Sequence, residues 1–326
     1  MRYYFAPMEG ITSYLHRAIH RRFFPGMDQY YMPFVSPSQG HAFTKREKAD
    51  LSPEHNAGVP AVPQLLTRRA EDFIWAAGEL AHMGYREVNL NLGCPSGTVT
   101  AKGKGSGFLA FPEELERFLD EIYGANLPID ISIKTRLGVR DEGEFPALLE
   151  LYNRYPVKEL TIHPRVQKDL YRLPVRPAAF AQAAEGCKLP LCYNGDLCTV
   201  ADCRNIEGQY PGVEAIMLGR ALVADPALVR KIQGGPPATA GELETFHNAL
   251  YDAYTEAFGS RRNAMLRMKE IWYYHIHLFR DHEKHAKHIR KARETGDFEA
   301  WTASAYRELE LLPELPQGLD DGTPWN

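Results

Sequence analysis

Short apolar runs alternate with segments of helical periodicity along about the first 235 residues of the chain. The runs lie at residues 2–6, 29–35, 61–66, 87–92, 130–135, 159–163, 190–194 and 214–218, and the clearest helical segments at 68–83, 112–124, 143–155 and 199–208. Short continuous apolar runs are typical of strands buried in a parallel sheet. Eight such strands, each followed by a helix, predict a (β/α)8 TIM barrel. A doubly wound sheet is the alternative, but it usually has fewer strands.

The pattern changes at residues 234–242, whose Gly, Pro and Ala content is typical of a linker. Helical segments follow at 243–258, 261–293 and 297–310, with no further strand signal. We therefore expect a barrel domain at 1–238 and a small all-helical domain at 239–326, which ends in an irregular acidic tail.

The composition, with 44% hydrophobic and 25% charged residues, is that of an ordinary globular protein. No apolar run approaches the ~18 residues of a membrane helix. The N-terminal segment has a single arginine and is interrupted by Pro7 and Glu9, so it does not resemble a secretory signal. Five cysteines, an odd number at low density, indicate reduced thiols. We expect a cytoplasmic protein without a membrane partner.

The net charge of −4 conceals a segregated distribution. Residues 1–239 hold 27 basic and 27 acidic side chains, so the excess of acid lies after them. Residues 260–293 carry ten Lys and Arg against three Asp and Glu, whereas 294–326 carry one Arg against eight acids. A local basic segment can bind phosphates whatever the global charge. The acidic tail is its competing partner within the chain.

Polar residues gather at the ends of seven predicted strands. In a TIM barrel the carboxyl ends of the strands form the active site, so these residues would converge on one mouth. They are Pro7, Met8, Glu9, Gly10, Gln64, Asn91, Cys94, Lys134, Arg136, His163, Arg165, Asn194, Gly195, Asp196, Gly219 and Arg220.

The last two strand ends have the character of a phosphate site. Asn194-Gly195-Asp196 and Gly219-Arg220 offer glycines for close backbone approach and an arginine for charge. Strands seven and eight supply the phosphate cradle in many barrels. Taken singly, each loop could instead be an ordinary tight turn.

Gln64 and Lys134 are polar residues in otherwise apolar strands. A lysine at a barrel mouth is costly unless it meets an anion. A flavin would use both residues, because a cation stabilises the anionic reduced ring and an amide can bind its pyrimidine edge. A lysine paired with a neighbouring strand remains the alternative.

Cys94 lies between Gly93 and Pro95 after the fourth strand and precedes the glycine-rich segment Lys102–Gly107. A thiol with a pKa near ~8.5 is protonated at neutral pH and can act as a general acid. A buried small residue is the alternative interpretation. The glycine-rich segment has no packing pattern, which favours a mobile lid.

No metal site is expected. Cys187, Cys192, Cys198 and Cys203 lack the spacing of a zinc site, and Cys198 and Cys203 would diverge on one helix. Five histidines lie at 275, 277, 282, 285 and 288. On a helix, 282, 285 and 288 would drift round one polar face among lysines that no carboxylate or cysteine joins, so we interpret them as a solvated or RNA-facing surface.

The sequence resembles the tRNA-dihydrouridine synthases. The most specific match is the run Val88-Asn-Leu-Asn-Leu-Gly-Cys-Pro95, followed at the family's spacing by Gly105-Ser106. The other strand-end residues follow in the family's order, and the resemblance is close over residues 1–235. It departs in the loop after the sixth strand, where Pro164 and Leu170 replace residues that are usually small and Ala179-Phe180 replaces Asp-Trp.

The resemblance implies an FMN enzyme that reduces a uridine of RNA, with tRNA as the expected substrate, to 5,6-dihydrouridine with NADPH. Hydride would pass from reduced FMN to C6 of the uracil, and Cys94 would protonate C5. The residues expected to bind FMN are Pro7, Met8, Glu9, Gln64, Lys134, His163, Asn194, Gly195, Asp196, Gly219 and Arg220. Those expected to bind RNA are Asn91, Lys102, Arg136, Arg165 and Arg290.

The basic segment is the expected RNA anchor, through its lysines and arginines rather than Trp272, Tyr273 and Tyr274, which we expect in the core. Two alternatives remain: a flavin barrel reducing a free small molecule, as a dihydroorotate dehydrogenase does, and a non-catalytic RNA-binding protein. The basic segment argues against the first, and an intact Cys94 and Lys134 argue against the second.

Overall fold

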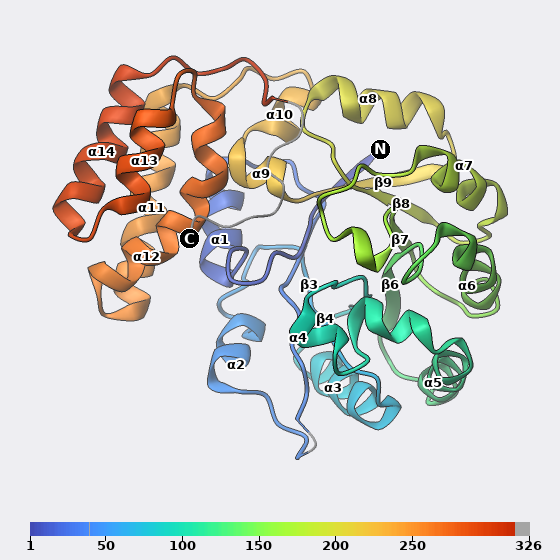
Figure 1. The fold of residues 1–326 in the computed structure, drawn as a ribbon. Coiled ribbons are helices and arrows are strands. Elements are labelled where there is room, and N and C mark those ends of the chain that lie inside the picture. Colours follow the sequence, from blue (N-terminus) through green and yellow to red (C-terminus); the bar gives the residue numbers. More distant parts are fainter. Residues whose placement is uncertain (39, 317–326) are drawn as a thin grey trace.

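The computed structural model describes residues 1–38 and 40–316. Its centre is one parallel sheet that curls into a barrel, with helices packed around the outside (Figure 1). The strands are β1 (Arg2–Phe5), β2 (Gln29–Tyr31), β3 (Ala61–Val62), β4 (Gln64–Leu65), β5 (Glu87–Leu92), β6 (Asp130–Arg136), β7 (Leu160–His163), β8 (Leu191–Asn194) and β9 (Val213–Leu218). The predicted TIM-barrel class is confirmed.

The third predicted strand, 61–66, is split in two. β3 pairs with β2 and β4 pairs with β5, so the ring of strands is interrupted between Val62 and Gln64. Pro63 lies at the interruption, and proline has no N–H to donate to a ladder. The predicted strand 29–35 is also shorter, although Val35 still forms an isolated bridge to Leu65.

The helices around the barrel follow the amphipathic segments of the sequence. They are α1 (Tyr14–Phe23), α2 (Lys45–Leu51), α3 (Ala70–His82), α4 (Gly97–Thr100), α5 (Pro112–Gly124), α6 (Phe145–Tyr152), α7 (Pro177–Gly186), α8 (Val200–Gln209), α9 (Arg220–Ala224) and α10 (Leu228–Ile232). Short 3-10 helices lie at Gly105–Ala110, Glu142–Glu144 and Gln167–Asp169. α8 begins at a capping box in which Thr199 and Asp202 satisfy each other's backbone N–H.

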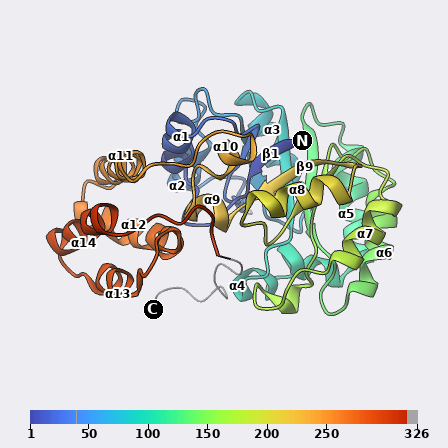
Figure 2. The ribbon, with the colours of Figure 1, turned by 90° about the horizontal axis from the view of Figure 1, so that it is seen from above.

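A separate group of helices lies beside the barrel, next to α1 and α9 (Figures 1 and 2). It consists of α11 (Ala240–Phe258), α12 (Arg261–His275), a 3-10 turn (Ile276–Leu278), α13 (Glu283–Lys291) and α14 (Thr295–Glu308). The prediction of one continuous helix over 261–293 is wrong. The helix ends at the 3-10 turn, and the next helix begins only after Asp281, which takes a positive φ of 50°.

The helical group packs closely on the barrel. His275 Nδ1 lies 2.8 Å from the carbonyl oxygen of Ala224, and the Tyr254 hydroxyl donates to the carbonyl of Ile11 at 3.3 Å. Gly10 allows α12 to approach, because a Cβ there would lie 2.9 Å from a guanidinium nitrogen of Arg267. Among the described residues, no helix is long and apolar enough to cross a membrane.

Candidate active site

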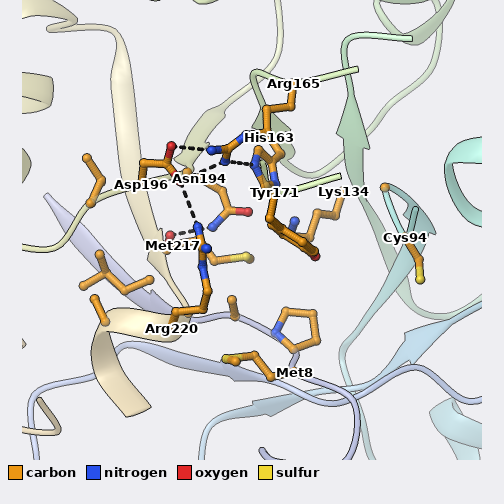
Figure 3. Close-up of a pocket in the computed structure, with 18 of the residues that line it drawn as sticks. Met8, Cys94, Lys134, His163, Arg165, Tyr171, Asn194, Asp196, Met217 and Arg220 are labelled. Carbon is orange, nitrogen blue, oxygen red and sulfur yellow. Dashed lines mark hydrogen bonds and ion pairs between the residues drawn. The ribbon is translucent and has the colours of Figure 1, made fainter. Parts of the chain in front are cut away.

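A cavity of about 720 Å³ opens at the carboxyl ends of the strands. Fourteen of the seventeen residues predicted for the site line it (Figure 3). They are Pro7, Met8, Glu9, Gln64, Asn91, Cys94, Lys134, His163, Arg165, Asn194, Gly195, Asp196, Gly219 and Arg220. Lys102, Arg136 and Arg290 are not in the lining.

The three remaining residues lie elsewhere. Arg136 is 1% exposed behind the cavity wall, where its Nε donates to the carbonyl of Gly93 at 2.9 Å. Lys102 is exposed in the turn after α4, and Arg290 is exposed on α13. Arg136 thus contacts the backbone of the Cys94 turn in this structure.

The wall formed by β7, β8 and β9 carries a compact ion-pair cluster. Arg165 donates to both carboxylate oxygens of Asp196, and Arg220 donates to the same carboxylate at 2.8 Å. Gly195, with a φ of 145°, brings the chain so close to His163 that a Cβ would lie 3.3 Å from the imidazole ring. The cluster holds two guanidinium groups at one end of the cavity (Figure 3).

His163 and Lys134 lie in the middle of the cavity wall (Figure 3). Arg165 donates to His163 Nε2 at 3.0 Å, so this nitrogen is the unprotonated one. Burial, together with the nearby cations Arg136 and Lys134, holds the pKa of His163 well below its usual range. Burial and Arg136 also lower the pKa of Lys134 to about 8. Both groups are therefore less positive than isolated side chains would be.

Cys94 occupies the opposite side of the cavity from the Asp196 cluster (Figure 3). Burial raises the pKa of its thiol, while the Ser96 backbone and the cations Arg136 and Lys134 oppose the rise. The balance keeps the thiol protonated at neutral pH, which is the form that a general acid needs. All five cysteines are free, as predicted.

The glycine-rich segment beside Cys94 is packed, so the prediction of a mobile lid is wrong. Gly105 to Leu109 are buried, and the backbone N–H and hydroxyl of Ser106 both donate to the carbonyl of Cys94. A Cβ on Gly105 would lie 2.7 Å from that carbonyl oxygen. Gly105 therefore permits close packing against Cys94.

Tyr171 is a cavity residue that the strand-end rule does not find, because it lies in the loop after β7. Its ring contacts two guanidinium groups, with the centroid 5.1 Å from that of Arg136 and 5.2 Å from that of Arg220. The preceding residue, Leu170, has a φ of 52°, a conformation that favours glycine. Tyr274 of α12 also lines the cavity, so the helical group contributes to its wall.

The histidines of the helical group need a correction. His285 is 6% exposed, with Nε2 3.0 Å from the hydroxyl of Ser304, so it does not belong to a solvated face. His288 instead stacks on Trp301, with ring centroids 3.9 Å apart. Within the described residues there is no group of three or more His, Cys, Asp or Glu side chains that could hold a metal ion.

A TIM barrel with a polar cavity at the carboxyl ends of its strands is the architecture of an enzyme. The sequence model of the dihydrouridine synthase family matches residues 4–310, so the chain belongs to that family. A tRNA-dihydrouridine(16) synthase of Cupriavidus necator is 31% identical over 72% of this chain and 74% of its own length. A tRNA-dihydrouridine synthase B of Pasteurella multocida is 26% identical over 71% of this chain and 69% of its own.

Solved structures agree at the level of the fold. Morphinone reductase superposes with a TM-score of 0.52 at 14% identity, over 73% of this chain and 87% of that one. A variant of an enzyme from Zymomonas mobilis gives a TM-score of 0.51 at 15% identity, over 73% and 88%. Both likenesses therefore support the TIM-barrel fold.

Proposed function

We propose that this protein is an FMN-dependent tRNA-dihydrouridine synthase that reduces a uridine of tRNA with NADPH. The observation that carries the proposal is the division of the cavity, with a thiol on one side and a cationic cluster with a close-approach glycine on the other. The family and the names of its relatives give the substrate class.

The residues present suit FMN. Arg165, Arg220 and the loops at Gly195 and Gly219 would receive its phosphate, which needs cations and close backbone approach. The Lys134 amine lines the cavity and has no hydrogen-bond or ion-pair partner among the described residues, so it is available to a flavin ring. When bound, reduced FMN would supply the hydride for C6 of the uracil.

Two side chains, Lys134 and Cys94, would then act on the bound cofactor and substrate. The Lys134 amine would face the ring and stabilise negative charge there. The Cys94 thiol would give its proton to C5 of the uracil, because charge develops there as hydride arrives at C6. The base must leave the RNA stack to reach this depth, so RNA contacts must supply the few kcal/mol of unstacking.

The helical group, which we propose as an RNA-binding domain over 239–326, would supply those contacts. Lys284, Lys287, Arg290, Lys291 and Arg293 are exposed on or after α13. The acidic segment neutralises part of the basic charge, since Arg280 pairs with Glu310 and Arg261 with Glu299. The five exposed residues therefore remain the better candidates for phosphate contacts.

The test is Cys94→Ala, assayed by mapping dihydrouridine in tRNA by mass spectrometry after reaction with purified enzyme and NADPH. We expect flavin binding and reduction by NADPH to persist, with uridine reduction slower by ~10²–10⁴-fold, the usual value of general-acid help. The matched control is Cys198→Ala, which removes another thiol of the cavity lining, beside the Asp196 cluster.

Three outcomes would contradict the proposal. A purified protein that shows no flavin absorption spectrum would exclude FMN as the cofactor. Reduction of a free pyrimidine but not of tRNA would favour a small-molecule reductase. If tRNA reoxidises the reduced Cys94→Ala enzyme at the wild-type rate, the Cys94 thiol is not the proton donor.

A further inference from the structure

Both backbone N–H groups of the turn that carries Cys94 are held by one buried side chain, that of Asn91, while Arg136 and Ser106 bind the carbonyls of the turn. The Oδ1 of Asn91 accepts hydrogen bonds from the backbone N–H of Gly93 at 3.1 Å and of Cys94 at 2.9 Å. Asn91 is 6% exposed, so water cannot readily replace it in this role. The orientation of its amide therefore decides whether the N–H groups of the turn keep their hydrogen bonds.

The other end of the Asn91 amide begins a chain of hydrogen bonds through the barrel interior. Asn91 Nδ2 donates to Gln64 Oε1 at 2.7 Å, and Gln64 Nε2 donates to Asn89 Oδ1 at 2.8 Å. Asn89 Nδ2 donates to Ser132 Oγ at 2.9 Å, and Ser132 Oγ donates to Glu87 Oε1 at 2.7 Å. Each of the five residues is at most 6% exposed. Alternate positions of β5 thus connect the bottom of the barrel to the active-site turn.

The direction in which these hydrogen bonds donate is fixed at Glu87, the end of the network farthest from Cys94. The Glu87 carboxylate accepts from the Tyr31 hydroxyl at 3.2 Å and from Gln29 Nε2 at 3.2 Å, and it forms an ion pair with Lys158 at 3.1 Å. An ionised carboxylate only accepts, so the Ser132 hydroxyl must donate to it and can only accept from the next amide.

The need to match each donor with an acceptor then fixes the orientation of the three amides one after another. Ser132 accepts, so Asn89 must present its NH2 there and its carbonyl to Gln64. Gln64 must then present its carbonyl to Asn91, whose own carbonyl is left for the turn. A reversed amide anywhere would set donor against donor in a buried site, which costs about 1–3 kcal/mol for each unsatisfied group. Aligned hydrogen bonds also strengthen one another.

We propose that Glu87, Ser132 and Asn89 are positioning residues for Cys94, which act on its turn through Gln64 and Asn91. The inference rests on the proposed function for its consequence in catalysis, because it assigns these residues to the placement of the proton donor. It also predicts a property of the resting enzyme, the accessibility of the thiol, that does not depend on any reaction.

The central experiment compares Ser132→Ala with Ser132→Thr in the flavin-loaded enzyme. Alanine removes the hydroxyl and breaks the chain, whereas threonine restores a hydroxyl on a residue that suits a strand. The matched control is Tyr4→Phe, which removes a buried hydrogen bond from Tyr4 to Glu159 (3.0 Å) elsewhere in the same barrel interior. Should Ser132→Ala fail to fold, Ser132→Cys fills nearly the same volume with a weaker hydrogen-bonding group.

Two readouts are measured for each variant. The first is the rate of alkylation of Cys94 by iodoacetamide across pH, resolved from the other cysteines by peptide mass spectrometry. The second is the rate at which tRNA reoxidises the reduced enzyme, measured apart from reduction by NADPH.

Loosening the turn in Ser132→Ala should speed alkylation of the half-buried Cys94 and slow reoxidation by tRNA, each by about tenfold, because small misplacements of a reacting group are costly. Reduction by NADPH should be unchanged. Ser132→Thr should restore both rates, and Tyr4→Phe should leave both at wild-type values.

Wild-type alkylation and reoxidation in Ser132→Ala would overturn the proposal, and so would equal effects in Tyr4→Phe. If the wild-type enzyme does not reduce tRNA at all, the proposed function fails. The alkylation measurement then still decides whether the chain positions the Cys94 turn.

Discussion

Four buried histidines should make the stability of this protein fall steeply in mild acid. Burial lowers the pKa of His16 and His20 on α1 to about 3, and that of His247 and His275 in the helical group to about 4. His16 and His20 pack on Phe246 of α11, and His275 hydrogen bonds to the barrel. The groups therefore lie in and beside the interface between the two parts of the chain.

The sign follows from proton binding. In the unfolded chain each histidine has a pKa near ~6.5, so below that pH the unfolded state binds protons that the folded state does not. The stabilisation is complete above about pH 6.5 and is lost progressively as the pH falls toward the folded values of about 3 to 4. At pH 5.5 each group costs somewhat more than ~1 kcal/mol, so the four together cost about 5 kcal/mol relative to pH 7.5.

One carboxyl group acts in the opposite direction. Burial raises the pKa of Glu159 to about 7, so the folded state gains a proton between pH 7.5 and 5.5 that the unfolded state does not. This offsets about 2 kcal/mol of the loss. We therefore expect the free energy of unfolding to fall by at least about 3 kcal/mol over these two pH units, because the buried His163, whose pKa also lies well below its usual range, adds to the loss. This is a large part of the ~5–15 kcal/mol that stabilises an ordinary domain.

The assay is urea denaturation followed by tryptophan fluorescence at pH 7.5, 6.5 and 5.5. His16→Leu is the informative variant, because His16 Nδ1 has no hydrogen-bond partner among the described residues and the substitution removes mainly the titrating group. It should reduce the loss of unfolding free energy between pH 7.5 and 5.5 by roughly 1 kcal/mol. His82→Gln, at a side chain that is 84% exposed, is the control. Equal unfolding free energies at pH 7.5 and 5.5, or a His16→Leu variant as pH-dependent as wild type, would refute the reasoning.

Three further predictions concern single features of the site and its surroundings. Lys134→Met should weaken flavin retention and slow reduction by NADPH together, because the reduced ring loses its cation; unchanged flavin content and reduction potential would contradict this. Neutralising Lys287, Arg290 and Lys291 should lower the slope of log affinity for tRNA against log salt by ~0.7–0.9 for each phosphate that the variant no longer binds, whereas Arg280→Gln, already paired with Glu310, should change it little. A slope equal to that of wild type at three salt concentrations would exclude a role for these residues in phosphate binding. Leu170→Gly should stabilise the protein by about 1 kcal/mol in urea denaturation, because glycine relieves a positive φ, and Leu173→Gly in the same loop should not. Destabilisation by Leu170→Gly would contradict the strain.

The barrel and most of the cavity lining could be predicted from the sequence because they follow from strand order. A residue at the end of a parallel strand has its place fixed by the sheet, so Gln64, Lys134 and His163 converge without any knowledge of packing. Arg136 shows the limit of that rule. It follows Lys134 by two positions in β6, yet its guanidinium turns to the carbonyls of Gly93 and Val166 behind the wall.

Local composition predicted the loops less well. Glycines at 103, 105 and 107 suggest mobility, but Gly105 packs against the carbonyl of Cys94 and Gly107 against the backbone of Thr100, an arrangement visible only in three dimensions. Tyr171 is similar, because its contact with two arginines depends on the course of the loop after β7. The break in the basic segment near Asp281 has no proline or glycine to announce it.

Tyr274 of the helical group lines the cavity, and Arg267 of the same helix lies against Gly10 of the first barrel loop. The boundary that the sequence marks near residue 239 is therefore no boundary of the active site. A barrel separated from its helices would lose part of its cavity wall, and a barrel given foreign helices would acquire a mismatched one. The two parts are not interchangeable modules: any change in how the helices meet the barrel also alters the cavity at the ends of the strands.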